Sequence, residues 1–178
     1  IHKSMPEVNL SDIDLAVKFI GYKLDAPILI EPMTGGTEVA EKINRHLASA
    51  AEELNIAMGV GSQRAALEDK VLTRTFKVVR EEAPSIPILA NIGCAQILHP
   101  EASDMVAEAI EMVEADGLVI HLNPLQEAIQ PEGETKFQGI SERIKELSKG
   151  LKTPIIVKET GAGICREVAA TLEQIGVE

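Results

Sequence analysis

Aromatic side chains are scarce in this chain, at 2% of 178 residues, and tryptophan is absent. Because aromatic rings usually supply much of the apolar area of a core, we expect this core to be built from Ile, Leu, Val, Ala and Met. Hydrophobic residues still make up 45% of the chain and charged residues 25%, as is typical of a soluble globular protein. The length is sufficient for one domain with a sizeable core.

Positive charge is also in short supply. The 17 Lys and Arg residues stand against 28 Asp and Glu residues, which gives a formal net charge of −11. This balance argues against nucleic acid or an anionic membrane as a partner. A phosphorylated substrate would therefore need Lys, Arg and backbone N–H groups concentrated at one place.

Long apolar runs, targeting segments and cysteine clusters are missing as well. No run approaches the length of a membrane-spanning helix, and no signal peptide, Walker A loop, nucleophile elbow or zinc signature is visible. Cys94 and Cys165 lie far apart without metal-ligand spacing, so we expect free thiols in a cytoplasmic protein. Because the chain begins with Ile1 and not Met, we expect the natural N-terminus to be missing or processed.

Apolar runs alternate with segments of helical periodicity about every 30 residues, the size of one βαβ step. Five near-continuous apolar runs predict parallel strands covered on both faces, at residues 27–32, 56–61, 86–92, 117–122 and 154–158. Three helices are predicted from apolar faces, which consist of Val39, Ile43, Leu47, Ala50 and Leu54, of Ile140, Ile144, Leu147 and Leu151, and of Ile164, Val168, Leu172 and Ile175. Residues 71–82 and 104–115 are expected to form two more helices with less even periodicity.

The first 25 residues lack helical periodicity. Residues 12–20 alternate like a strand, and Gly21-Tyr22-Lys23 then predicts a turn, so residues 1–25 are interpreted as an antiparallel preamble. Residues 26–178 carry about five βα units, and a sheet that ended there would leave an unpaired edge. The pattern leaves open a fragment of a barrel or a compact open α/β domain. The fold class we expect is a (β/α)8 TIM barrel of which this chain holds about the first five units.

Polar or glycine-rich residues follow each predicted strand. In a parallel sheet these positions meet on one side, where barrels of this class carry their active sites. The most polar stretch, residues 121–133, follows the fourth strand and brings an imidazole, carboxamides and carboxylates together. The alternative is a loop with ordinary turn residues.

Several of these residues have a chemical interpretation and a plainer structural one. Thr34 and Gly35 offer a hydroxyl and unobstructed N–H groups to a flat cofactor or an anion, or they form a tight βα turn. The Arg64 guanidinium fits phosphate oxygens, or it is a solvated surface charge. Asn91 binds the edge of a heterocycle, or it ties two loops together. Lys158 stabilises an anion or a bound phosphate, or its ammonium simply reaches solvent.

The residues after the fourth strand are interpreted in the same way. His121 has an ordinary pKa near neutrality and serves as an acid or base, or it is a hydrogen-bonded structural histidine. Glu127 is a candidate oxygen ligand for Mg²⁺, or it is a surface carboxylate. Gln126 and Asn123 strengthen the functional interpretation because further polar groups crowd the same loop.

Taken together, these motifs resemble those of the type 2 isopentenyl diphosphate isomerases, flavin-dependent enzymes of isoprenoid synthesis. The resemblance covers nearly the whole chain, and its most specific part is the stretch from His121 to Gly133. The matching pieces are Met33-Thr34-Gly35-Gly36, Gly61-Ser62-Gln63-Arg64, Ala90-Asn91-Ile92-Gly93, His121-Leu122-Asn123, Gln126-Glu127, Gln130-Pro131-Glu132-Gly133 and Val157-Lys158-Glu159, with Met5-Pro6-Glu7 and Asp12-Ile13-Asp14-Leu15 before them.

The resemblance implies interconversion of isopentenyl and dimethylallyl diphosphate by an allylic proton shift, with FMN, Mg²⁺ and NAD(P)H as the reductant. It implies catalytic roles for Gln126 and His121, and Mg²⁺ binding by Glu127. The residues implied to bind FMN are Thr34, Gly35, Ser62, Asn91 and Lys158. Those implied to meet the substrate are Ser62, Gln63, Arg64, Asn123 and Gln126.

The family also has features that this chain lacks. Its N-terminal Arg-Lys substrate contacts would precede Ile1, and its Gly-rich loops for the FMN phosphate would follow Glu178. Cys165 stands where the family often has a small hydroxyl residue. We therefore expect a polypeptide limited to residues 1–178 to be inactive.

Two other functions stay open from the sequence. One is another FMN-dependent barrel oxidoreductase, such as a relative of the 2-hydroxy-acid oxidases. The other is a non-catalytic partial barrel that acts as an assembly partner. Exposed sheet edges and the family resemblance both predict a homo-oligomer.

Overall fold

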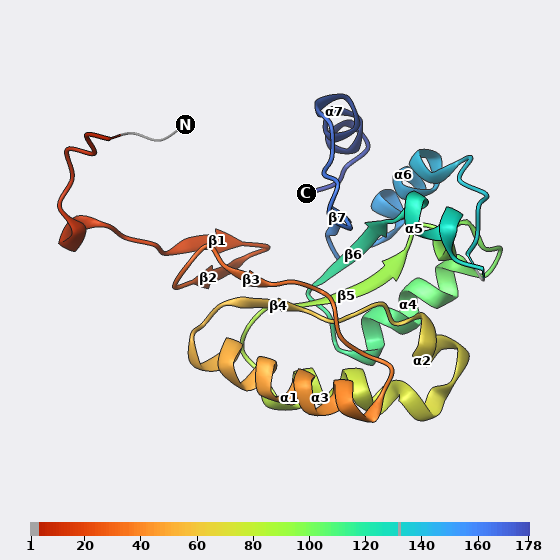
Figure 1. The fold of residues 1–178 in the computed structure, drawn as a ribbon, viewed down its shortest axis with the longest axis horizontal. Coiled ribbons are helices and arrows are strands. Elements are labelled where there is room, and N and C mark those ends of the chain that lie inside the picture. The colour runs from red at the N-terminus through yellow and green to blue at the C-terminus, as the bar shows by residue number, and fades with distance from the viewer. Residues whose placement is uncertain (1–3, 132) are drawn as a thin grey trace.

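The computed structural model describes residues 4–131 and 133–178, and its central element is a parallel sheet of five strands in the order β3-β4-β5-β6-β7 (Figure 1). The strands are β3 (Leu29–Ile30), β4 (Ala57–Gly59), β5 (Ile88–Gly93), β6 (Gly117–Leu122) and β7 (Ile155–Glu159). Each predicted apolar run therefore holds a strand. Since the strands are parallel and in chain order, their carboxyl ends lie along one side of the sheet.

The fold class expected from the sequence is wrong for this chain. A (β/α)8 barrel closes because its first and last strands pair, whereas here β3 pairs with β4 and β7 pairs with β6. The described residues hold no further strand that joins these two edges. The architecture is an open α/β partial barrel.

A short hairpin precedes the sheet. Strand β1 (Val17–Phe19) pairs antiparallel with β2 (Tyr22–Leu24), and Gly21 between them has φ of +91°. This confirms the antiparallel pairing predicted for the preamble, but Tyr22 and Lys23, predicted to lie in the turn, belong to β2. The predicted strand at 12–20 is too long, because Asp12 ends the 3-10 turn η1 (Leu10–Asp12) and pairing starts only at Val17. Residues 1–3 lie outside the described part of the chain, as does Glu132 of the Gln130–Gly133 motif.

Helices follow the strands, as expected for βα units. They are α1 (Glu38–Glu53), α2 (Arg64–Glu68), α3 (Arg74–Glu82), α4 (Ala102–Met112), α5 (Pro124–Ile129), α6 (Ile140–Gly150) and α7 (Arg166–Gln174), with 3-10 turns η2 (Lys70–Thr73) and η3 (Gln96–Leu98). In Figure 1, α1 and α3 lie side by side along one face of the sheet. None of the described helices is long and apolar enough to cross a bilayer.

The buried face of α1 differs from the predicted one. The helix buries Ala40, Asn44, Ala48 and Ala51, whereas Val39, Ile43 and Leu54 are exposed. The small alanine side chains allow α1 to lie close against α3. The face of α1 that is buried is therefore the one that packs closely, and not the one with the largest apolar side chains. For α6 the prediction is confirmed, since Ile144 and Leu147 are buried. In α7, Leu172 is buried but Val168 is 41% exposed.

The core is built mainly from aliphatic side chains, as predicted, and all six residues of β5 are buried. The exception is Phe76 of α3, which is fully buried and is the largest of the fully buried side chains. A Cβ atom on Gly35 would lie 1.9 Å from the Phe76 ring. The glycine after β3 is therefore required by this aromatic ring.

Candidate functional site

A cavity of about 490 Å³ opens at the carboxyl ends of the strands. It brings together five of the residues predicted from the sequence, each from a different segment: Ser62 after β4, Asn91 in β5, His121 in β6, Gln126 in α5 and Lys158 in β7. Its remaining lining residues are Glu31, Pro32, Met33, Glu159, Thr160 and Gly161. Parallel order explains this convergence, because every strand delivers its last residues to the same side.

The central pair of this cavity is Asn91 and His121. The His121 Nδ1 atom lies 2.9 Å from the Asn91 Oδ1 atom. The Asn91 Nδ2 group donates to the Val60 carbonyl at 3.1 Å and to the Pro32 carbonyl at 3.5 Å. Asn91 is 2% exposed, and both ends of its carboxamide are satisfied by protein groups.

Gln63 holds the backbone of Asn91. Its Oε1 accepts from the Asn91 N–H at 2.9 Å, and its own N–H donates to the Asn91 carbonyl at 3.0 Å. Its Nε2 donates to the Ala109 carbonyl of α4 at 2.8 Å. Gln63 is fully buried and lies outside the lining of the cavity. The substrate contact predicted for Gln63 stays a prediction. In the structure, the Gln63 side chain connects β5 to α4 through hydrogen bonds.

His121 is held neutral by its surroundings. Burial and, to a smaller extent, the neighbouring Lys158 ammonium lower its pKa to about 4, while Glu127 acts in the opposite direction. His121 and Lys158 lie opposite each other in the register of β6 and β7. At neutral pH the imidazole therefore carries one proton and keeps one nitrogen free to accept.

Lys158 lies at the far side of the cavity, with a side chain that is 15% exposed. Its ammonium donates to the Glu159 carbonyl at 2.9 Å and lies 3.1 Å from the Glu31 carboxylate. Glu31 follows β3, so this ion pair joins the two opposite edges of the sheet. A cation at this place favours negative charge on a bound group.

Glu159 is a site residue that the sequence argument missed. Its Oε2 atom accepts hydrogen bonds from the backbone N–H groups of Gly161, Ala162 and Gly163 at 2.5–2.8 Å. These bonds lower its pKa to about 2, the Gly163 N–H having the largest effect. The signal in the sequence is Gly161-Ala162-Gly163, which begins two residues after Glu159, because the successive N–H groups of such a turn can surround an anion. Here that loop forms one wall of the cavity.

Thr34 and Gly35 do not line the cavity. The Thr34 hydroxyl donates to the Asn44 side chain, and the Asn44 amide donates in return to the Thr34 carbonyl at 3.2 Å. Gly36 N–H donates to the Thr75 hydroxyl at 3.0 Å. These bonds tie the β3 loop to α1 and α3, and the cofactor contacts predicted for Thr34 and Gly35 stay predictions.

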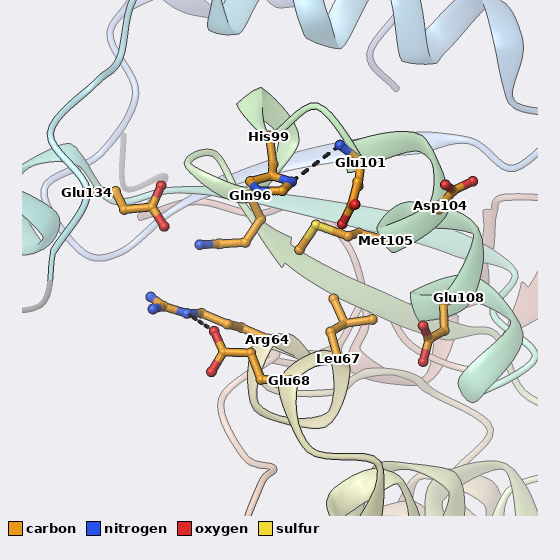
Figure 2. Close-up of a pocket in the computed structure, with 10 residues that line it drawn as sticks. All are labelled: Arg64, Leu67, Glu68, Gln96, His99, Glu101, Asp104, Met105, Glu108 and Glu134. Carbon is orange, nitrogen blue, oxygen red and sulfur yellow. Dashed lines mark hydrogen bonds and ion pairs between the residues drawn. The ribbon is translucent and has the colours of Figure 1, made fainter.

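Arg64 lies in a second cavity, of about 420 Å³, which Figure 2 shows. Its guanidinium donates to the Glu68 carboxylate at 2.9 Å, and this hydrogen bond raises the pKa of Arg64. Five carboxylates line the cavity: Glu68, Glu101, Asp104, Glu108 and Glu134. The Gln96 amide points into it beside Arg64, and Gln96 is 6% exposed. The basic environment expected for a diphosphate is thus limited to Arg64 and neutral donors.

Asn123, which directly precedes helix α5, and Glu127, within that helix, form a buried pair. The Asn123 amide donates to Glu127 Oε1 at 2.8 Å, and the Glu134 N–H donates to Glu127 Oε2 at 2.8 Å. The Cys94 thiol lies 3.5 Å from the Asn123 carbonyl oxygen, and burial raises the pKa of that thiol. Both cysteines are free, as predicted.

The residues around Glu127 do not fit Mg²⁺ as they stand. Both of its oxygens accept hydrogen bonds, and Glu127 is 6% exposed. Among residues 4–131 and 133–178 no group of three or more His, Cys, Asp or Glu side chains is arranged to hold a metal ion. The Mg²⁺ role predicted for Glu127 therefore lacks a ligand set in the described part of the chain.

No protein-family model matches the chain. Curated relatives match it along almost its whole length. It is 50% identical over 177 residues to the isopentenyl-diphosphate delta-isomerase of Aeropyrum pernix, which covers 99% of this chain and 47% of that protein. The chain is similar to the isopentenyl-diphosphate delta-isomerases. The relative from Pseudescherichia vulneris is 49% identical over 176 residues, covering 99% of this chain and 51% of that protein. The chain thus spans about half the length of the curated relatives it matches.

The resemblance to the type 2, FMN-dependent isomerases is corrected by this comparison. The curated relatives are named isopentenyl-diphosphate delta-isomerase, a name that gives neither a type nor a cofactor. The similarity is therefore to proteins named isopentenyl-diphosphate delta-isomerase, without a type or a cofactor. It extends over about half the length of those proteins.

Solved structures share the fold. A mutant flavocytochrome b2 with pyruvate bound superposes with a TM-score of 0.69 at 17% identity, covering 100% of this chain and 46% of that one. A mutant (S)-mandelate dehydrogenase gives 0.61 at 17% identity, covering 97% and 55%. At this identity the likeness is one of fold alone.

Proposed function

We propose that the protein acts as an isopentenyl-diphosphate delta-isomerase, with this chain supplying one side of its active site. The observation that carries the proposal is the 50% identity over 99% of the chain to a relative of that name. The strand-end cavity supports it, since five residues predicted from the sequence line that one cavity. In this reaction one proton is added at one end of an allylic system and a different proton is removed from the other end, so the number of protons does not change.

We further propose that the cavity binds FMN. The lining fits the polar edge of a flavin: Ser62 offers a hydroxyl and Lys158 an ammonium, around a cavity of about 490 Å³. When bound, reduced FMN would supply the group that exchanges the proton and would stabilise positive charge in the substrate. NAD(P)H as the source of reduction is also a proposal. Since the residues near Glu127 do not fit Mg²⁺, no step is assigned to that ion.

The chain's own residues then have distinct tasks. Lys158 favours negative charge at the flavin edge and Ser62 orients it. The Asn91 carboxamide is already bonded within the protein and faces His121, so its predicted flavin contact stays a prediction. His121, neutral at working pH, accepts a hydrogen bond or a proton at its free nitrogen. Gln126, at the start of α5, is proposed to contact the reacting part of the substrate.

Diphosphate binding is proposed for the neighbouring cavity. Arg64 and the Gln96 amide both offer N–H donors there (Figure 2). The Glu68 carboxylate already holds Arg64, so a diphosphate must compete with it. Asn123 acts on this region through Glu127, whose carboxylate it holds.

The decisive test uses the protein at its natural length, with residues 1–178 alone as a comparison expected to be inactive. FMN, a reductant and isopentenyl diphosphate are supplied, and dimethylallyl diphosphate is followed by proton NMR. Gln126→Ala should reduce turnover by more than tenfold while FMN affinity, measured by fluorescence quenching, stays within twofold. Gln138→Ala serves as the matched control, because Gln138 is exposed and lies outside both cavities.

Other results would assign other functions. Reduction of bound FMN by a 2-hydroxy acid, without isomerisation, would identify an oxidoreductase like the structural neighbours. Defined oligomers without flavin binding would identify an assembly protein. That the protein forms a homo-oligomer stays a prediction, which light scattering would check. A cytoplasmic location also stays a prediction.

A further inference from the structure

The hydrogen bond between Asn91 and His121 has a defined direction. The Asn91 Nδ2 group faces two carbonyl oxygens, those of Val60 and Pro32. If the carboxamide were turned over, its oxygen would face both carbonyls at the same distances, and no hydrogen bond would form. Asn91 Oδ1 is therefore the atom that faces His121, and it can only accept.

The acceptor on Asn91 determines where the imidazole proton lies. At 2.9 Å from Oδ1, the His121 Nδ1 atom must carry a hydrogen to form the bond. A neutral imidazole has one N–H, so its Nε2 atom then carries a lone pair. Within the described residues, Nε2 has no hydrogen-bond partner, and it is not among the fully buried side-chain atoms that lack one. Nε2 therefore keeps access to solvent, on a residue that lines the strand-end cavity.

The position of Asn91 is itself fixed by its neighbours. Gln63 bonds both the N–H and the carbonyl of Asn91, so the backbone cannot rotate to offer His121 a donor. Gly93, on the same strand, leaves room for the ring, since a Cβ there would lie 3.0 Å from Nε2. The charged groups that act on His121 are Lys158, which opposes a second proton, and Glu127, which favours it.

We propose that Asn91 is a positioning residue that fixes His121 as the tautomer with its proton on Nδ1, so that Nε2 presents a lone pair to the strand-end cavity. In an isomerase this nitrogen would accept a hydrogen bond or a proton from the bound ligand. That use rests on the proposed function, whereas the tautomer itself does not. A fixed tautomer avoids the reorganisation that a freely tautomerising imidazole needs at each turnover.

The tautomer is measured directly by two-bond proton–nitrogen correlation NMR on the ¹⁵N-labelled protein at neutral pH. The His121 signals are identified by their loss in His121→Gln. We expect a protonated Nδ1 and an unprotonated Nε2 in the unsubstituted protein. A protonated Nε2 in that spectrum overturns the proposal, and this reading requires neither a variant nor any enzymatic activity.

Two variants test the part played by Asn91. Asn91→Asp keeps an acceptor facing Nδ1, so the Nδ1–H tautomer should persist in the folded variant. Its second oxygen faces the Val60 and Pro32 carbonyls, so folding of this variant is checked first by circular dichroism. Asn91→Ala removes the acceptor, so the Nε2–H tautomer should gain at least half of the population. Asn44→Ala removes another buried carboxamide, which bonds Thr34 and Thr75 and does not touch His121, and should leave the tautomer unchanged. If the folded Asn91→Ala variant kept the same His121 tautomer, a group other than Asn91 would fix that tautomer, and the positioning role of Asn91 would be wrong.

The tautomer result and the isomerase result are independent. If the tautomer is as expected but no isomerisation occurs, the positioning role of Asn91 stands and the proposed function fails. If isomerisation occurs with a protonated Nε2, the proposed function stands and the positioning role fails. Where both hold, Asn91→Ala should lower kcat more than it raises KM.

Discussion

The Lys158 ammonium lies 3.1 Å from the Glu31 carboxylate, and these two residues belong to opposite edges of the sheet. Both residues line the strand-end cavity, so the pair links the two sheet edges there without any strand pairing. Because Glu31 is 56% exposed, we expect the pair to contribute at most about 1 kcal/mol to stability. Its greater effect is on Lys158, whose charge the Glu31 carboxylate partly compensates.

Removing this carboxylate should strengthen anion binding. Glu31→Gln frees the Lys158 ammonium, so we expect the affinity for FMN to rise about two- to fivefold, which is under about 1 kcal/mol. The measurement is a flavin-fluorescence titration. Glu53→Gln is the matched control, since Glu53 is exposed and carries the same charge far from the cavity. An equal rise in both variants would assign the effect to net charge.

The protonation of His121 should make stability depend on pH. Its pKa is about 4 in the fold against 6.5 in the unfolded chain, so the unfolded state binds the proton more readily. The free energy of unfolding should therefore fall as the pH decreases from about 6.5 to about 4, by on the order of 3 kcal/mol. Urea unfolding at several pH values in this window measures the slope. His121→Gln should flatten it, whereas His99→Gln, at an exposed position, should not.

The Glu159 carboxylate should control the exchange of three backbone amides. In Glu159→Gln the charge is lost, so hydrogen exchange at residues 161–163 should accelerate while the core strands keep their protection. Hydrogen exchange followed by mass spectrometry resolves this loop. Glu173→Gln, an exposed change in α7, provides the comparison. Equal loop protection in both variants would contradict the role given to Glu159.

Gly35 should not accept a methyl group. In Gly35→Ala the new Cβ would meet the Phe76 ring at 1.9 Å, so we expect a loss of about 1–3 kcal/mol from overpacking. Chemical denaturation measures it. The double variant with Phe76→Leu should recover part of the loss, because the two changes share one space. Gly150→Ala is the control, since nothing lies within 4 Å of a Cβ there, and it should lose less than 0.5 kcal/mol by the ordinary range for surface changes.

The sequence predicted the strands well because parallel strands covered on both faces leave continuous apolar runs. It also predicted that Ser62, Asn91, His121, Gln126 and Lys158 meet, since strand order alone brings their positions together. Closure of the sheet into a barrel was not predictable in this way. It requires the first and last strands to pair, and the local sequence pattern of one strand does not show which strand it pairs with.

Side-chain direction was the other limit. Gln63 and Arg64 are adjacent in sequence to Ser62, yet Gln63 is buried under β5 and Arg64 enters a different cavity. The turn into α2 rotates each residue by a helical step, and no periodic signal marks where that rotation begins. The buried face of α1 was missed for a related reason, because Ala40, Ala48 and Ala51 carry little apolar signal.

The hydrogen bonds of Gln63 connect helix α4 to the strand-end cavity. One side chain touches the Met112 sulfur and the Ala109 carbonyl of α4, and also holds the backbone N–H of Asn91. A change of volume at Met112 would therefore displace Asn91, and through it the imidazole, without any contact with a ligand. Substitutions on the buried face of α4 are thus constrained by the geometry of the strand-end cavity.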